Sequence, residues 1–207
     1  MPLKSNTPTA MTFRTRFRPK PIARLASPMA GTLLLVLLLV CGPRWPLEAQ
    51  NSQPGEYEVK AAFLYNFAKF VEWPPGAFPS RTSPITIGVL SDERFQSVLG
   101  QTLIGKTAQD RALVVRRLDA SLQDASQCHI VFVSSAERGA ISDLLNATKG
   151  TSVLTVSETE GFAQRGGMVN FLLIENKVRF EINNLSAKNS GLKISARLLQ
   201  LAANVWE

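Results

Sequence analysis

The chain has 207 residues, 45% of them hydrophobic, which is enough for one domain of ordinary size with a buried core. Its formal net charge of +7 would suit a nucleic-acid-binding protein, but seven basic residues and only one acidic residue lie within residues 1–48. The rest of the chain holds 16 basic and 15 acidic residues, so nucleic acid is not an expected partner.

Residues 1–49 have the three parts of a secretory signal peptide: a basic stretch up to Arg24, an apolar run over Thr32–Val40 and a short exit ending at Ala49. The apolar run of about nine residues is too short to cross a bilayer, since a spanning helix needs about 20. We therefore expect cleavage after Ala49 and export to the periplasm. An uncleaved membrane anchor and a lipid attached to Cys41 remain as alternatives.

After a polar linker over residues 50–55, the sequence predicts one domain over 56–207 that begins with a helix. Prolines 74 and 75 end this helix at Trp73, because neither can donate a helical hydrogen bond. At about 100° per residue one narrow apolar stripe forms, which indicates a core-facing helix. Its members are Val59, Phe63, Phe67 and Phe70.

Short apolar runs alternate with helix-like segments through the middle of the chain. The pattern predicts strands at Ile85–Leu90, Leu113–Leu118, His129–Val133 and Val153–Val156, and helices at Glu93–Leu99 and Glu137–Ala147. Such alternation favours parallel strands joined by right-handed crossovers.

The C-terminal part follows a different pattern. Two β-rich runs, Met168–Ile174 and Lys177–Ile182, flank Glu175-Asn176, which is typical of a two-residue hairpin. Ser195 is placed to cap a last helix whose apolar face holds Leu198, Leu201 and Val205. The whole pattern predicts an α/β three-layer sandwich: a mixed, mostly parallel sheet with a C-terminal β-hairpin plus helix. We expect its core to include Phe63, Phe67, Phe70, Leu198 and Leu201.

Few residues carry catalytic chemistry. His129 is the only histidine, and it follows Cys128 at the start of an apolar strand, where adjacent side chains point to opposite faces. The two cannot easily form one dyad, and they are too few for a usual zinc site. Asp92 is interpreted as a helix N-cap. We therefore expect no enzymatic activity, no cofactor and no metal, and we expect Cys128 to be buried.

The segment Ser157–Gly167 is a predicted loop that is long enough to carry function. Gly166-Gly167 precedes a strand rather than a helix, so it is interpreted as a turn and not as a phosphate-binding loop. The side chains that the loop offers to solvent or a ligand are Glu158, Glu160, Phe162 and Arg165.

An ordered set of segments resembles the YfiR family, also called DUF4154, over roughly residues 56–206. The set is Lys60–Phe70 followed by Val71-Glu72-Trp73-Pro74, then Cys128-His129-Ile130, Leu154–Ser157, Gly161-Phe162, Gly166-Gly167, Arg179–Asn183 and Leu192–Ser195 with Leu198-Leu199. The resemblance implies a periplasmic α/β domain without known enzymatic activity. Relatives bind the periplasmic part of an inner-membrane diguanylate cyclase and hold it inactive, and others work beside sensor kinases or receptors. Relatives with disulfides can be redox controlled, whereas a lone Cys128 cannot close an intramolecular bridge.

Two functions of different classes follow. The first is a regulator that binds and represses an inner-membrane signalling protein. The second is a small-molecule-binding module that reports to a sensor kinase or receptor, and a homodimer is compatible with either. We expect the contact surface to comprise Trp73, Glu160, Phe162, Arg165, Arg179 and Glu181. The alternative for Trp73 is that it only covers the end of its helix.

Overall fold

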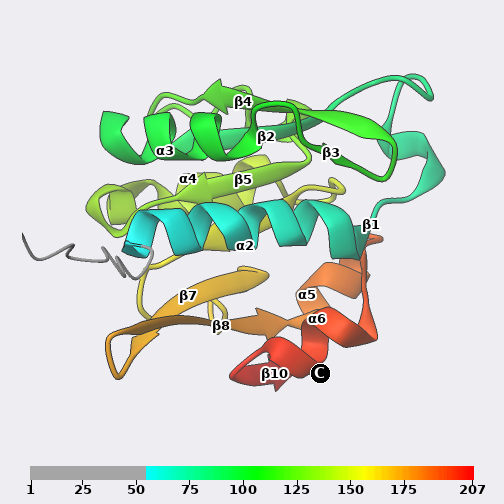
Figure 1. Ribbon diagram of the computed structural model, residues 1–207. Coiled ribbons are helices and arrows are strands. Elements are labelled where there is room, and N and C mark those ends of the chain that lie inside the picture. The colour runs from blue at the N-terminus through cyan, green and yellow to red at the C-terminus, as the bar shows by residue number, and fades with distance from the viewer. Residues whose placement is uncertain (1–54) are drawn as a thin grey trace, which may run out of the picture. The chain divides into compact units, whose positions relative to one another are not determined.

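The apolar runs of the sequence form strands of one main sheet. The computed structural model describes residues 55–207, so the expected signal peptide over residues 1–49 and the alternatives at Cys41 lie outside the described residues. Within this range the main sheet has eight strands in the order β10-β8-β7-β6-β5-β2-β4-β3 (Figure 1). Their bounds are β2 Ile85–Leu90, β3 Thr107–Ala108, β4 Arg111–Arg117, β5 Ile130–Val133, β6 Leu154–Ser157, β7 Val169–Ile174, β8 Lys177–Asn183 and β10 Asn204–Trp206.

The sheet is mixed and mostly parallel, as predicted. Strands β7, β6, β5, β2 and β4 run in one direction. The edge strand β3 and the hairpin strand β8 are antiparallel to β4 and β7, and β10 runs parallel to β8. Every residue of β2, β5 and β6 is buried, because layers cover both faces of these central strands.

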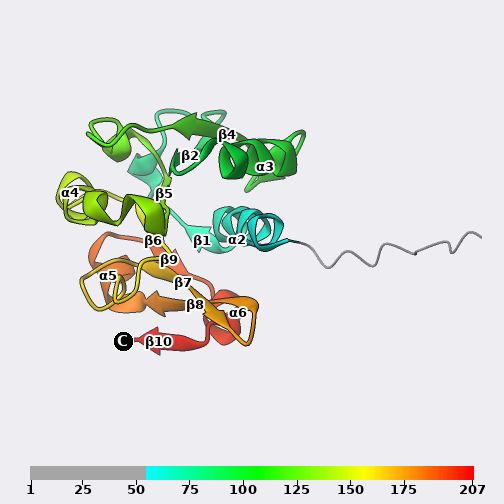
Figure 2. The same ribbon diagram turned by 90° about the vertical axis from the view of Figure 1, so that its left-hand side faces the viewer.

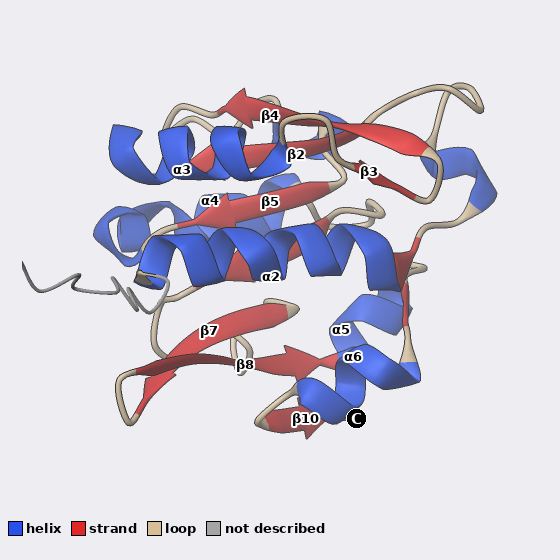
Figure 3. Cartoon of the chain, viewed as in Figure 1, coloured by secondary structure: helices blue, strands red, loops and turns tan. Residues whose placement is uncertain are grey.

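Helices form these covering layers, as Figure 2 shows. On one face lie α2 (Glu56–Phe70), α3 (Glu93–Leu103) and α6 (Ala196–Leu201). On the other face lie α4 (Ile141–Ala147) and α5 (Asn184–Asn189). Three short 3-10 turns complete the connections: η1 Pro75–Ala77, η2 Ala125–Gln127 and η3 Ser135–Ala140. The predicted three-layer α/β sandwich is thus confirmed, and Figure 3 shows its helices and strands by colour.

The first helix ends earlier than predicted. α2 stops at Phe70 instead of Trp73, because the chain extends into β1 (Val71–Glu72). This short strand pairs antiparallel with β9 (Lys193–Ile194), which joins the start of the domain to its C-terminal part. The pairing supplies backbone hydrogen bonds that the sequence pattern around the prolines did not indicate.

Two other helix boundaries also differ from the prediction. α3 continues through Gly100 to Leu103, because Phe95, Leu99 and Leu103 lie four residues apart and all bury on one helical face. α4 begins at Ile141, because Glu137 has non-helical backbone angles within the preceding η3 turn.

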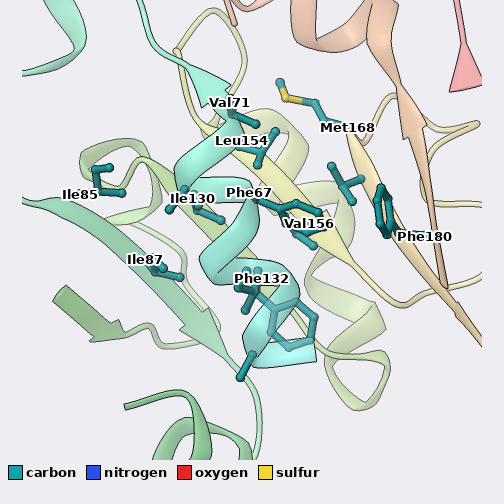
Figure 4. Packing of buried hydrophobic residues seen from close by; sticks show 14 of the residues in the cluster. Phe67, Val71, Ile85, Ile87, Ile130, Phe132, Leu154, Val156, Met168 and Phe180 are labelled. Atoms are coloured by element: carbon teal, nitrogen blue, oxygen red, sulfur yellow. The ribbon is translucent and has the colours of Figure 1, made fainter. Parts of the chain in front are cut away.

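The main core lies between α2 and the sheet (Figure 4). Phe67 is fully buried, with its ring centroid 5.8 Å from that of Phe171 and 5.3 Å from that of Phe180. Phe63 and Phe70 pack against this cluster while partly exposed, and Leu198 is buried as predicted. A second, smaller cluster fills the space between the sheet and α4.

The prediction that Leu201 belongs to the core is wrong, since its side chain is 57% exposed. Ser195 caps α6 as predicted, by accepting a hydrogen bond from the Leu198 N–H at 3.3 Å. The helix nevertheless ends at Leu201, and Ala202 is already extended. Val205 then lies in β10 opposite Ile182, because pairing with β8 satisfies the backbone that a longer helix would have used.

The predicted two-residue hairpin is confirmed. Ile174 pairs with Lys177 across the turn, and the two turn residues, Glu175 and Asn176, have φ angles of 49° and 57°. Positive φ at both positions is the conformation of a type I′ turn, whose twist matches that of the flanking strands. Because β6 pairs with β7 only as far as Asn170, the hairpin projects beyond the end of β6.

Candidate functional site at the carboxyl edge of the sheet

The carboxyl ends of the central parallel strands gather polar residues at one edge of the sheet. From β2 the chain passes to β4 on one side, and then returns to β5 on the other side of β2. α/β sheets bind ligands next to such a reversal, outside the carboxyl ends of the strands. Three segments meet there: Ser91-Asp92 after β2, Ser134-Ser135 after β5 and Glu158 after β6.

Lys60 of α2 reaches this edge and is held between two carboxylates. Its side chain is only 7% exposed, and its Nζ donates to Glu56 and Glu158. Oε1 of Glu158 accepts in addition from the Ser135 N–H at 3.0 Å and from the Ser135 hydroxyl at 3.1 Å. Burial alone lowers the pKa of Lys60, but the hydrogen bonds to Glu158 and Glu56 outweigh it and raise that pKa. Lys60 is therefore a fixed, buried cation at neutral pH.

A second polar contact ties α2 to α3 beside Lys60. The Tyr57 hydroxyl donates to Oδ2 of Asp92 at 2.6 Å, and the Phe95 N–H donates to Oδ1 at 2.8 Å. The hydrogen bond to Asp92 raises the pKa of Tyr57 to about 12, and the same bond, together with that from Phe95, lowers the pKa of Asp92. Asp92 is thus the helix N-cap that the sequence predicted, and its second oxygen anchors α2.

A hollow of about 160 Å³ lies beside Lys60, between α2 and the β7–β8 hairpin. It is lined by the polar residues Glu56, Lys60, Ser135 and Glu158 and by the apolar residues Phe171, Leu172, Leu173 and Val178. A groove of about 700 Å³ adjoins it and shares Glu56, Leu173 and Val178. Nearby, the buried Ser134 hydroxyl has no hydrogen-bond partner within residues 55–207.

The Ser157–Gly167 loop begins at this edge, and its members differ in exposure. Glu160 and Arg165 are exposed as predicted, and an Arg165 Nη2 donates to the Glu160 carbonyl at 3.2 Å. Phe162 is fully buried in the cluster under α4, so the expectation that it faces solvent is wrong. Gly167 allows this burial, because a Cβ there would overlap the Phe162 ring.

Trp73 lies just beyond the C-terminal end of α2, at the amino edge of the sheet, where the central parallel strands begin. Glu158 and the start of the loop lie at the carboxyl edge, near the other end of this helix. The Trp73 ring is half-buried, with centroid distances of 6.2 Å to both Phe78 and His129. Its Nε1 is buried without a hydrogen-bond partner within residues 55–207. The structure therefore does not bring Trp73 to the start of the loop, and its surroundings match the alternative in which it covers the helix end.

Arg179 and Glu181 both lie on β8, but their surroundings differ. Arg179 is exposed and lines the groove beside α2. Glu181 is only 6% exposed and accepts hydrogen bonds from Asn170 at 3.2 Å and from the Trp206 indole N–H at 3.4 Å. Glu181 thus joins β7 and β10 to β8, whereas Arg179 is free to meet a ligand.

His129 and Cys128 are engaged in separate contacts at the amino edge. Nδ1 of His129 accepts from the Thr86 N–H at 3.0 Å, and Nε2 lies 3.3 Å from the Ala77 carbonyl, so the neutral ring carries its proton on Nε2. Burial lowers the pKa of His129 and raises that of Cys128, which packs in the cluster under α4 as a buried thiol. Within residues 55–207 no three His, Cys, Asp or Glu side chains gather as a metal site.

Residues 57–203 match the model of the YfiR/HmsC-like family, DUF4154. The chain belongs to this family. In the YfiR-like part that the structure describes, no helix has both the length and the apolarity to cross a membrane.

The fold of this YfiR-like chain is similar to that of a solved conserved domain protein from Vibrio cholerae, with a TM-score of 0.50 and 11% sequence identity. The similarity covers 72% of this chain and 60% of that chain, so this chain spans less than two thirds of the other protein's length. At such low identity the likeness shows the fold alone. No curated protein matches the sequence.

Sequence reasoning missed Lys60, Ser134 and Leu173 as members of the carboxyl-edge site. One signal was present for Lys60, because it lies on the same helical face as the buried Leu64 and Phe67. A lysine on a buried stripe needs an ionic partner, but the partner Glu158 is 98 residues away in the sequence. The exposure of Leu173 depends on how far the hairpin projects beyond the sheet, which no local pattern reveals.

Proposed function

We propose that this YfiR-like chain is exported to the periplasm and regulates an inner-membrane signalling protein, such as a diguanylate cyclase, by binding its periplasmic part and holding it inactive. The family match carries this proposal, since it spans nearly all of the described domain. The basic, apolar and small-residue segments of residues 1–49 support export. The structural contacts of His129 and Cys128 support a regulatory rather than an enzymatic role.

The Ser157–Gly167 loop is proposed to supply part of the contact surface. Glu158 ties one end of the loop to Lys60, and Phe162 anchors its middle in the core. A loop held in this way loses little conformational entropy on binding, so its exposed Glu160 and Arg165 are ready to meet a partner. We propose that Arg179 on the neighbouring hairpin extends this surface. Of the other predicted residues, Phe162 and Glu181 are buried and support this surface from within, whereas Trp73 lies at the other edge of the sheet and is not part of it.

Co-purification from membranes tests the proposed partner class. A tagged chain is expressed in its own bacterium, the inner membrane is solubilised, and the proteins that remain bound are identified. The expected result is one diguanylate cyclase or sensor kinase, together with a rise in cyclic di-GMP or in kinase output when the chain is deleted. Recovery of neither class of protein, with no change in signalling, contradicts the proposal.

Charge reversal tests the proposed surface. Arg165→Glu should weaken binding to the recovered partner about tenfold while the melting temperature stays unchanged, because an exposed interface charge acts on association and not on the fold. Arg81→Glu is the matched control, since Arg81 is an exposed cation near the amino edge. Equal binding by both variants would show that the loop is not part of the interface.

A further inference from the structure

We propose that the groove between α2 and the β7–β8 hairpin binds a small molecule that carries a carboxylate on an apolar body. This site adds a ligand to the proposed regulator, and it does not depend on which membrane protein the regulator binds. In Figure 1 the hairpin lies beside the first turns of α2, at the carboxyl edge of the sheet. Four features of the groove carry the inference: its shape, its charge, its apolar wall and the position of Glu56.

The shape of the groove suits a ligand with a narrow head and a wider body. The inner hollow of about 160 Å³ reaches Lys60 and Ser135, and the outer groove of about 700 Å³ reaches Val59, Lys177 and Arg179. Both are lined by Glu56, Leu173 and Val178, so one opens next to the other. Small-molecule sites in proteins have volumes of about 300–1,000 Å³, which brackets the outer groove.

The charges that line the groove favour an anion. Two carboxylates, Glu56 and Glu158, are already bound to the buried Lys60. Lys177 and Arg179 also line the groove, and among residues 55–207 neither forms an ion pair. Lys177 and Arg179 alternate with Val178 on β8, so these long cationic side chains lie at the rim of the groove, where a ligand carboxylate would pass them on its way to Lys60.

Solvent-exposed apolar side chains form part of the wall of the groove. Leu173 is 61% exposed, and Val59 and Val178 beside it are partly exposed. Leu173 and Val178 are cross-strand partners near the tip of the hairpin, so their side chains form part of a firm surface. An apolar ligand body that covers them removes this area from water, which is the main source of affinity in such a site.

The Glu56 carboxylate occupies the position next to Lys60 that the ligand carboxylate would take. Glu56 is the first residue of α2, its side chain is 49% exposed, and it reaches inward to Lys60. When a ligand carboxylate replaces it, Glu56 returns to water and Lys60 keeps two anionic partners, so no buried charge is left unpaired. Glu158 stays bound to Lys60 and lies at the start of the loop that carries Glu160 and Arg165. The ligand would therefore bind next to the proposed partner surface.

Calorimetric titration of the purified chain tests this site with defined probes. The carboxylates are 3-phenylpropanoate and octanoate, and the neutral match is 3-phenylpropanamide. At least one carboxylate should bind, and the amide should bind at least tenfold more weakly than its acid. Amide NMR shifts should centre on Ser135, Leu173 and Val178. Absence of binding by both carboxylates at millimolar concentration overturns the proposal, as do equal affinities for the acid and the amide.

Three variants sharpen the test, and each changes an exposed or half-exposed side chain, so the fold is retained. Glu56→Gln should raise carboxylate affinity severalfold, because it weakens the internal competitor for Lys60. Arg179→Gln should lower the affinity about tenfold, and Leu173→Asp should abolish binding, while Ile104→Asp, an exposed aliphatic residue outside the groove, should change nothing. If Glu56→Gln and Arg179→Gln both leave the carboxylate affinity unchanged, or if the NMR shifts centre on His129, the ligand does not bind in this groove. Neither outcome bears on the proposed protein partner.

Discussion

The two ends of α2 meet the two edges of the sheet in different ways. Near its start, Lys60 lies buried between carboxylates and beside a hollow. Beyond its end, Trp73 packs against a stack in which the Phe78 and His129 ring centroids are 4.4 Å apart. The first end is held by charges, one of which belongs to the half-exposed Glu56, whereas the second is held by neutral rings and backbone hydrogen bonds.

Volume alone does not distinguish the two edges. The amino edge has a hollow of about 690 Å³, as large as the groove beside α2. Its lining consists of prolines, small residues, hydroxyl-bearing side chains, Gln127, Val153, Cys128 and His129, and the described part of the chain contributes no Asp, Glu, Lys or Arg to it. The groove at the carboxyl edge is lined by Lys177 and Arg179, which have no ion pair within residues 55–207. The two edges therefore differ in charge and not in the size of their hollows. The carboxyl edge combines these unpaired cations with apolar surface, and this combination can select a ligand.

The largest expected effect comes from the middle of α2, which holds both edges together. Phe67→Ala removes a fully buried ring and should lower the free energy of unfolding by about 3–5 kcal/mol. Urea denaturation measures this loss, and Leu201→Ala is the control, with an expected change below about 0.5 kcal/mol because Leu201 is exposed. A Phe67→Ala variant as stable as the parent would contradict the role of α2 as the shared support.

A smaller loss should follow when only the charged end is broken. Lys60→Met leaves Glu158 without its cation, and removal of one partner from a buried ion pair costs about 3 kcal/mol. Adding Glu158→Gln removes the orphaned charge and should recover most of that stability in the same denaturation experiment. If the double variant is no more stable than Lys60→Met, the lost stability arises from packing. The ion pair between Lys60 and Glu158 would then not be what stabilises the carboxyl edge.

The aromatic end should instead respond to mild acid. Burial lowers the pKa of His129 in the folded state below its ordinary 6.5, so folding favours the neutral ring. This contribution to stability is complete above pH 6.5 and is lost as the pH falls below it. Denaturation curves between about pH 7.5 and about pH 5.5 should therefore show a decline in the parent that is smaller in His129→Gln. An equal decline in both proteins would assign the pH dependence to other groups.

The smallest effect is expected at the exposed contact between Tyr57 and Asp92. Because the folded-state pKa of Tyr57 is raised to about 12, its stabilising effect is present below pH 10 and is lost as the pH rises toward 12. The chain has only two tyrosines, so tyrosinate absorbance during alkaline titration can resolve it. Tyr57→Phe should remove the late-titrating component while changing stability at neutral pH by less than about 1 kcal/mol. A late component that persists in Tyr57→Phe would contradict the assignment of the raised pKa to Tyr57.

Several features were predictable because their causes lie within a few residues. The alternation of apolar runs predicted the parallel strands, and the caps at Asp92 and Ser195 predicted where two helices begin. Asn at a position of positive φ made the hairpin turn predictable without glycine. The end of α2 was not predictable in this way, because pairing of β1 with β9 joins segments more than a hundred residues apart.

By itself the sequence determined the α/β layer pattern, the family resemblance and the exposure of Glu160 and Arg165, because periodicity, capping, charge and motif order are read along the chain. Only the tertiary structure decided that Phe162 is buried, that Trp73 lies away from the start of that loop, and that Lys60 meets Glu158. The reason is physical: burial and ion pairing depend on which distant segments approach one another. The carboxyl-edge groove exists only where α2, β6 and the projecting hairpin come together.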